Sequence, residues 1–359
     1  MKGAGAVSVS VGHAVVATRN FSYAAWTSIG LTFPAPVAAG QTITLTLTSA
    51  PGAAAGTAGY FAAASANADL EYTADDGQIL HAIAEFIRIV DQDEYGAGSP
   101  KKLQQFYADA AAYYADILNH HFDTRWEGEW VEQTRGNRNI GFYIIPAAWS
   151  GAYANPNYPA GSSLPYNEYQ SYGRFLLELY HIALIRGTQG AAQNAAYAMH
   201  VTRMAETLLG AVTPYGPGYV WDYSGKYVEP DSNRSLFIED AAHANFDIAY
   251  VADLYNLASV YPGAGLNQFS AANVSAFTST FENRLYDPAT VTLLQYVNGT
   301  GANNGEYGHQ YSNWPMLSPV DPRPLADVLA LFDNHAVTTV GETMYPLTLA
   351  NMALYGGSL

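Results

Sequence analysis

The sequence predicts a mainly α-helical protein in which antiparallel helical hairpins follow an N-terminal β-rich region. Apolar residues recur with helical spacing from residue 75 onward, whereas stretches before residue 50 alternate with period two. The composition changes near residue 69, because the first 68 residues contain only two charges, Lys2 and Arg19. We therefore expect a β-rich region over residues 1–70 and a helical domain over residues 71–359.

The β-rich region carries strand patterns at residues 6–11 and 41–48, where polar and apolar residues alternate. Pro34, Pro36 and Pro51 separate these patterns from the rest of the region. A surface with almost no charge is poorly suited to exposure in water. We expect the region to pack on the helical domain or on a neighbouring subunit, which favours a homo-oligomer or a larger assembly.

Eight stretches of the remaining chain predict helices, and the first follows Asp75 and Asp76, which suit a helix N-terminus. The expected helices cover residues 77–92, 101–121, 168–186, 190–211, 236–259, 270–286, 324–334 and 340–355. Short connections join the helices of each pair, and long connections join successive pairs. The long connections cover residues 122–167, 212–235 and 287–323. If consecutive helices are antiparallel, all three emerge at one end of the domain.

Aromatic residues gather in these long connections, which contain five of the six tryptophans. Long connections in compact domains are often functional, and indole rings suit stacking on sugars. We expect an aromatic-lined cleft with these substrate-binding candidates: Trp126, Trp130, Trp149, Trp221, Trp314, Tyr166, Asn167 and His309. The alternative is that the connections pack their aromatic side chains on themselves, as lids over the core.

The composition excludes several classes of function. The net charge of −16 disfavours nucleic acid and anionic membranes, since both attract basic surfaces. There is no cysteine, so disulfides, thiolate nucleophiles and cysteine-based zinc sites are excluded. No stretch approaches the ~20 apolar residues of a membrane-spanning helix. The first residues lack a signal-peptide pattern. We expect an extracellular, cell-surface or virion-associated protein whose signal has been removed or which leaves its cell without one.

The start of the predicted helix 236–259 holds the strongest candidate for chemistry. At about 100° per residue, Asp240, His243 and Asp247 fall in one sector of the helix, on its apolar side. His243 could act as a general acid or base oriented by Asp240 or Asp247. Glu239 or Asp240 could instead belong to a glycosidase carboxyl pair.

Two further interpretations of the same segment remain open. Asp240, His243 and Asp247 could bind a divalent metal; otherwise no cofactor is expected. Alternatively, Glu239 and Asp240 simply favour the helix N-terminus, and His243 is a buried structural histidine.

The preceding connection adds Tyr223 and Arg234 to the candidate catalytic residues. A tyrosine, a histidine and an arginine suit β-elimination from a uronic acid. The arginine or an amide neutralises the carboxylate, histidine or tyrosine removes the C5 proton, and tyrosine protonates the leaving oxygen. The alternative is aromatic packing beside a surface arginine.

The helical hairpins, the long connections at one end, and the runs 219–221 and 239–247 resemble the α/α-toroid glycan-processing enzymes, nearest to polysaccharide lyases of the alginate and heparinoid type. The resemblance implies an Asn or Arg neutraliser beside a His/Tyr pair. Residues of compatible type are Asn167, Tyr223, Arg234, His243 and Asn245. Four hairpins, where a full toroid has five to seven, imply a partial or small toroid.

Together these observations predict a polysaccharide-degrading enzyme, with β-elimination on a uronic-acid-containing glycan as the leading reaction. An inverting glycoside hydrolase using Glu239 or Asp240 is the second hypothesis. The third is a non-enzymatic assembly or glycan-binding protein of a virion, filament or cell surface, which the nearly chargeless β-rich region motivates.

Overall fold

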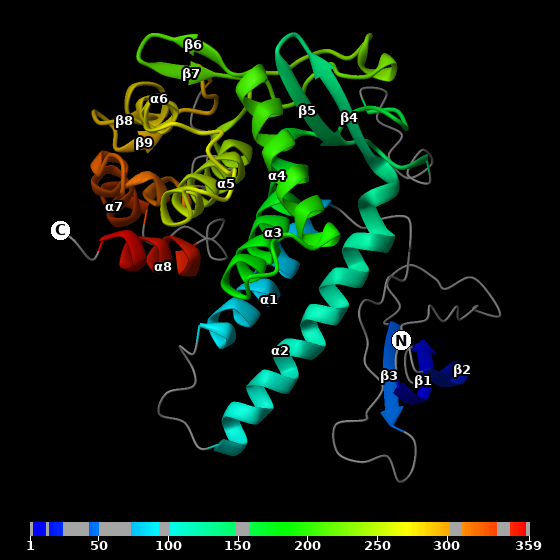
Figure 1. Ribbon diagram of the computed structural model, residues 1–359. Coiled ribbons are helices and arrows are strands. Elements are labelled where there is room, and N and C mark those ends of the chain that lie inside the picture. Colours follow the sequence, from blue (N-terminus) through cyan, green and yellow to red (C-terminus); the bar gives the residue numbers. More distant parts are fainter. Residues whose placement is uncertain are drawn as a thin grey trace. The chain divides into compact units, whose positions relative to one another are not determined.

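The computed structural model describes residues 3–11, 14–23, 43–49, 73–92, 101–147, 158–301, 311–335 and 345–356 of the 359-residue chain. The chain divides into two compact units, Met1–Glu71 and Tyr72–Leu359. The first unit contains β-strands, and the second contains all the described helices (Figure 1).

The first unit contains a three-stranded antiparallel sheet in the order β2-β1-β3. Its strands are β1 (Gly3–Val11), β2 (Ala14–Tyr23) and β3 (Ile43–Ser49). The central strand places Val7 opposite Arg19 of β2 and opposite Leu47 of β3. The strand predicted from the pattern at residues 6–11 is therefore confirmed, as is that at residues 41–48 from Ile43 onward; residues 41 and 42 lie outside the described residues.

The second unit contains eight described helices, which confirms the mainly α-helical class. They are α1 (Thr73–Asp91), α2 (Lys101–His121), α3 (Tyr166–Ile185), α4 (Ala192–Ala211), α5 (Ala241–Val260), α6 (Ala271–Thr280), α7 (Arg323–His335) and α8 (Tyr345–Gly356). Each of them overlaps one predicted helical segment, and residues 340–344 of the last segment lie outside the described residues. The sixth predicted helix, 270–286, ends its α-helical part at Thr280 and continues as a π-helical turn over Phe281–Leu285.

Helix α3 lies at the centre of this unit. It packs against α1, α4 and α5, while α2 packs on α1 and α6 packs on α5 (Figure 1). Fourteen of the twenty residues of α3 are buried. A Cβ atom at Gly77 of α1 would lie 2.3 Å from the backbone of Ser171 in α3, so this close approach of the two helices requires glycine.

The long connections contain regular structure, which the sequence analysis did not predict. Each holds a two-stranded antiparallel hairpin. The hairpins are β4 (Trp130–Arg135) with β5 (Arg138–Tyr143), β6 (Thr213–Tyr215) with β7 (Gly218–Val220), and β8 (Tyr286–Asp287) with β9 (Thr292–Leu293). The hydroxyl of Thr207 in α4 accepts a hydrogen bond from the amide of Gly141 at 3.1 Å, which fixes β5 on that helix.

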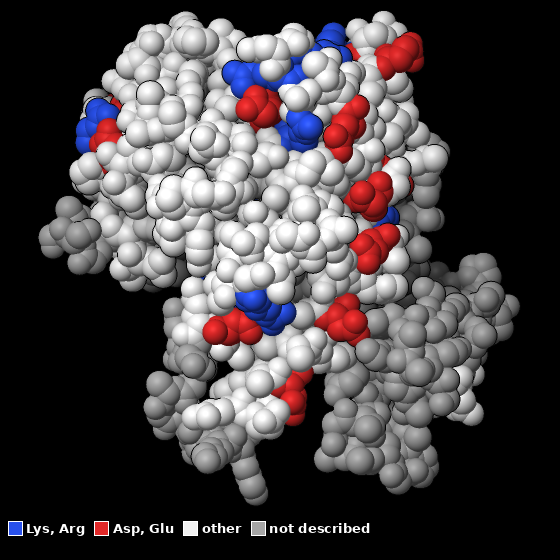
Figure 2. All heavy atoms as spheres, viewed as in Figure 1, with Lys and Arg blue, Asp and Glu red and all other residues white. Residues whose placement is uncertain are grey.

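The surface carries few charges, as expected from a chain with 13% charged residues. On the face drawn in Figure 2, Lys and Arg atoms lie next to Asp and Glu atoms, while further Asp and Glu groups stand alone, and wide uncharged areas separate these groups. None of the described helices combines the length and apolar character needed to cross a bilayer.

Candidate active site

The candidate site begins where an extended segment turns into α5. This helix starts at Ala241, five residues later than the position 236 that the sequence pattern predicts. Ile238 forms a β-bridge with Asp222, and Asp240 forms one with Tyr296. These bridges use the backbone groups that a longer helix would need, so the segment before Ala241 stays extended.

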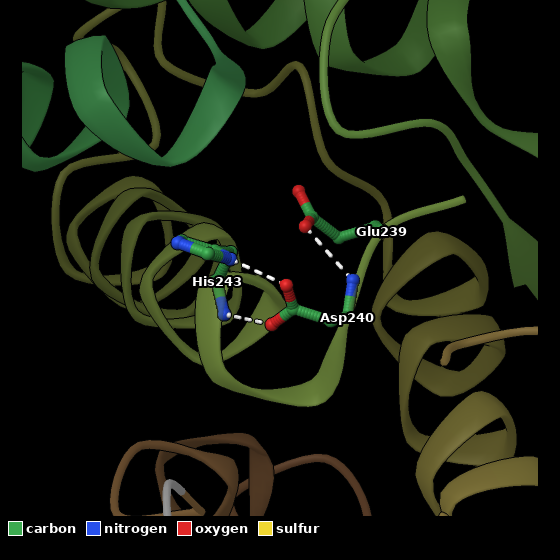
Figure 3. A group of neighbouring side chains, drawn as sticks. All are labelled: Glu239, Asp240 and His243. Carbon is green, nitrogen blue, oxygen red and sulfur yellow. Dashed lines mark hydrogen bonds and ion pairs between the residues drawn. The ribbon is translucent and has the colours of Figure 1, made fainter. Parts of the chain in front are cut away.

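Asp240 is the N-cap of α5. Its Oδ1 accepts hydrogen bonds from the amides of Ala242 at 2.9 Å and His243 at 3.0 Å. Its Oδ2 lies 2.6 Å from Nδ1 of His243 (Figure 3). A proton on Nδ1 that is donated to this carboxylate leaves the lone pair of the imidazole on Nε2. The His243 side chain is 33% exposed, so the ring reaches the surface of the protein.

Tyr223 lies against this histidine, with 4.8 Å between the two ring centroids. Its amide donates to the carbonyl of Phe237 at 2.7 Å, and its carbonyl accepts from the amide of Tyr166 at 3.2 Å. Burial raises the pKa of Tyr223, and the carboxyl of Glu168 raises it further. The hydroxyl of Tyr223 therefore keeps its proton at neutral pH.

Glu168, in the first turn of α3, is a residue that the sequence analysis did not single out. Burial and the carboxylate of Asp75 in α1 raise its pKa from 4.5 to about 7. Its Oε2 is buried and has no hydrogen-bond partner among the described residues. The start of α3 lies close to the site, because the amide of Tyr166 donates to the carbonyl of Tyr223 at 3.2 Å. An acidic residue in a first turn is common for reasons of helix electrostatics, so no sequence signal marks Glu168.

Glu239 and Asp247 lie beneath the exposed pair and are completely buried. The indole Nε1 of Trp221 donates to Oδ2 of Asp247 at 2.9 Å. The amide of Asp240 donates to Oε1 of Glu239 at 3.0 Å. Burial raises the pKa of both carboxyls, that of Asp247 to about 8.

A possible metal-binding group is present, but its members differ from the predicted set. Glu239, Asp240 and His243 each offer one donor atom, and these atoms lie within 4.8 Å of one another. Asp247 is bound to Trp221 instead and is not part of this group. The donors suit Zn²⁺ or Mn²⁺. A metal on Nδ1 of His243 would have to displace the hydrogen bond that Nδ1 donates to Asp240.

Arg234, a predicted neutraliser, is buried and held by the protein itself. Its guanidinium lies 2.9 Å from a carboxylate oxygen of Asp231 and donates to the carbonyl of Ser163 at 2.8 Å. The guanidinium also lies over the ring of Tyr158, 4.6 Å from its centroid. These contacts give Arg234 a structural function in joining the segments before and after β7.

The two candidate asparagines are also buried. Asn245 accepts a hydrogen bond from the amide of Asn313 at 2.8 Å and donates to the hydroxyl of Ser312 at 3.2 Å. Its amide group therefore anchors the segment before the helical turn Trp314–Leu317. Asn167 lies in the first turn of α3, and its Oδ1 finds no hydrogen-bond partner in the part of the chain that the structure describes.

The aromatic candidates within the described residues are largely core residues. Trp126, Trp221 and Trp314 are at most 2% exposed. Trp130 is half-buried and stacks on His200, with 3.9 Å between the ring centroids. This arrangement agrees with the alternative that the long connections pack their aromatic side chains on the core.

The remaining candidates for substrate binding are Tyr166, Trp149 and His309. Tyr166 is buried, and its hydroxyl lies 2.6 Å from that of Tyr227. Trp149 and His309 lie outside the described residues.

The structure thus brings together Tyr223, Glu239, Asp240 and His243 from the predicted catalytic residues and adds Glu168, while Asp247, predicted as a partner of His243, is bound to Trp221. Comparisons of the chain with protein-family models, with curated proteins and with solved structures found no match.

Proposed function

We propose that this chain cleaves a polysaccharide by acid–base catalysis at the start of α5, and that the reaction is β-elimination at a uronic acid. The observation that carries the proposal is the contact between Tyr223 and the Asp240–His243 pair. The pair supplies an oriented base at the surface, and the tyrosine supplies a proton donor beside it.

In the proposed reaction, Nε2 of His243 takes the proton from C5 of the uronate. The electron pair of the C5–H bond forms the C4=C5 double bond, and the glycosidic C4–O bond breaks. The hydroxyl of Tyr223 donates its proton to the departing oxygen, a role that suits a tyrosine whose pKa is raised by burial. Asp240 stabilises the imidazolium that forms on His243.

Elimination also requires a group that neutralises the substrate carboxylate, because this makes the C5 proton acidic. The hydrogen bonds of Arg234 and Asn245 to the protein argue for a different residue. We assign this function to Glu168, whose pKa of about 7 leaves it protonated in mildly acidic solution. A neutral carboxyl group can donate a hydrogen bond to the substrate carboxylate.

The helix packing supports a glycan-processing fold. The neighbouring helices α1, α3 and α5, with α2, α4 and α6 each packed on the preceding helix, match what is expected of one part of an α/α toroid. Assembly through the β-rich unit and an extracellular, cell-surface or virion location belong to the same proposal. They rest on the sequence patterns.

An inverting glycoside hydrolase is the second candidate. The observation in its favour is the accumulation of carboxyl groups around Tyr223, including Glu168 and Asp240. Glu168 would be the general acid and Asp240 the general base that activates water. The net charge of −16 also disfavours a polyanionic substrate and favours a neutral glycan.

The test is incubation of the protein with alginate, glucuronan, heparosan, hyaluronan and pectate. The ultraviolet absorbance of the C4=C5 uronate and the formation of reducing ends are both measured. A rise in absorbance that His243→Ala abolishes supports the lyase. New reducing ends without absorbance support the hydrolase. No change in either readout on any polymer contradicts both and leaves the binding or assembly protein.

A further inference from the structure

Arg284 is a basic residue for which the described part of the chain supplies no acidic partner. It stands in the π-helical turn Phe281–Leu285 that follows α6. Its Nε is enclosed without a hydrogen-bond partner, whereas its two Nη groups, which make no hydrogen bond to the described residues, are not enclosed. The arginines that do form ion pairs with Asp or Glu are Arg88, Arg138, Arg174, Arg186, Arg203, Arg234 and Arg323. In a chain with 31 acidic and 15 basic residues, such an arginine points to a partner from outside the chain.

A tyrosine and two glycines hold the guanidinium of Arg284 in place. It lies over the ring of Tyr215 in β6, 4.3 Å from the centroid, and Tyr215 is itself 48% exposed. A Cβ atom at Gly216 would lie 3.1 Å from Nη2, and a Cβ atom at Gly299 would lie 3.5 Å from Cδ. Both glycines have positive φ values, 63° and 82°. None of these contacts uses an N–H donor of Arg284, so the donors are positioned and remain free to bind.

The segments that hold the guanidinium also build the candidate active site. The hairpin of β6 and β7 continues along the chain toward Tyr223. The loop 295–301 is bound to the start of α5, where the amide of Ala241 donates to the carbonyl of Gln295 at 2.8 Å. The position of Arg284 is therefore fixed relative to the residues of the proposed reaction.

We propose that Arg284, held between Tyr215 and Gly216, is an oxyanion subsite that binds a carboxylate group of an acidic glycan away from the catalytic position. A guanidinium binds a carboxylate through two parallel N–H···O hydrogen bonds, and the two Nη groups offer this pair of donors. The net charge of −16 repels a polyanion as a whole, so a uronate chain needs local cationic contacts of this kind. The assignment of the bound group to a uronate rests on the proposed function, whereas the affinity of Arg284 for an oxyanion does not.

Oxyanion binding is tested by proton NMR on the Nε–H of Arg284, identified by its loss in Arg284→Gln. Because Nε is enclosed, its proton is protected from rapid exchange with water. Sodium glucuronate, glucose and sodium sulfate are added in separate titrations at constant ionic strength. Glucuronate should shift the signal to a saturating value, and glucose, which lacks the carboxylate, should leave it unchanged. Absence of a saturable shift with glucuronate overturns the subsite, and a shift with sulfate alone identifies a site for inorganic anions and overturns the glycan assignment.

The contribution to glycan binding is tested by steady-state kinetics on the polysaccharide that the wild type cleaves. Arg284→Gln should raise KM about 10-fold and change kcat less than about twofold, because the contact acts equally on the substrate and the transition state. Arg284→Lys keeps the charge but lacks the planar pair of donors, so its KM should lie between these values.

Arg186→Gln is the matched control, because Arg186 already donates to Asp91 at 2.6 Å and should not contribute to KM. Equal KM values for Arg284→Gln and Arg186→Gln overturn the contribution of Arg284 to glycan binding. The NMR titration needs no turnover. A saturable glucuronate shift without cleavage of any polysaccharide therefore supports the subsite and contradicts the proposed reaction, and cleavage without the shift does the reverse.

Discussion

Nδ1 of His243 lies 2.6 Å from Oδ2 of Asp240, and the other oxygen of that carboxylate caps the helix on which His243 stands. One side chain therefore fixes both the first turn of α5 and the orientation of the imidazole. Because the residues are three positions apart, the geometry is set within a single helical turn.

Substituting Asp240→Asn should separate these two functions. Asparagine is an equally good N-cap, so the free energy of unfolding should change by less than about 1 kcal/mol. Loss of the carboxylate removes the partner of the imidazolium, and activity should fall about 10²- to 10⁴-fold. Urea unfolding and initial rates on the cleaved polysaccharide measure the two effects. Unchanged activity would exclude His243 as a base oriented by Asp240.

Tyr223→Phe should lower kcat by a similar factor of about 10²–10⁴, because it removes the proton donor for the leaving oxygen. The ring and its contact with His243 remain, so Tm and KM should change little. Substrates with a good leaving group need less protonation and should be affected less. If kcat on such a substrate falls as much as on the polysaccharide, Tyr223 is not the acid.

Glu168→Gln should change the pH profile of kcat/KM. In the wild type, Glu168 is protonated below its pKa of about 7, so activity should decline as pH rises through that value. Glutamine donates a hydrogen bond at any pH, and the variant should not show this decline. A profile identical to that of the wild type would contradict the assignment of Glu168 as the neutralising group.

Arg234→Met should destabilise the protein without a specific loss of activity. The guanidinium is 2.9 Å from Asp231, and both side chains are buried, so the substitution removes the counter-charge of a carboxylate in the interior. Breaking such a pair costs about 3–5 kcal/mol. The change is measured by urea unfolding, and kcat/KM is determined at a temperature where the variant is folded. A large loss of kcat/KM with unchanged stability would instead support the predicted neutraliser.

Gly77→Ala should destabilise the packing of α1 on α3, since its Cβ would lie 2.3 Å from the backbone of Ser171. The helices have to separate locally, and overpacking of this kind costs about 1–3 kcal/mol. Gly128→Ala is a suitable control, because a Cβ there meets nothing within 4 Å. Equal Tm values for the two variants would show that the helices accommodate the methyl group.

The sequence predicts mainly those helices and strands whose own residues carry a clear hydrophobic pattern. The pattern of α2 predicted residues 101–121, which are the observed bounds. The hairpin of β4 and β5 was missed although Gly136 and Asn137 form a typical two-residue turn between its strands. The expectation of a long loop took precedence over that signal.

The first residue of α5 cannot be predicted from the residues around it. Leu236 and Phe237 extend the apolar pattern of the helix toward the N-terminus, yet they belong to the preceding extended segment and are 41% and 50% exposed. The β-bridge between Asp240 and Tyr296 holds that segment, and Tyr296 is far away in the sequence. A single sequence contains no information on such a pairing.

The candidate site likewise combines contacts that follow from helical spacing with contacts that depend on how the helices pack. Asp240 and His243 are in contact because of helical spacing, which the sequence displays. Glu168 reaches the site from another helix, and Asp247 turns toward Trp221 rather than toward His243. These placements depend on how α3 and α5 pack, so they could not be derived from spacing alone.

Helix α3 has a consequence for the synthesis of the protein. Its buried side chains are covered by α1, α4 and α5, and α5 ends only at Val260. A ribosome that has released the chain as far as α4 therefore presents a helix with one apolar side still uncovered. Incomplete chains of this length are prone to aggregate.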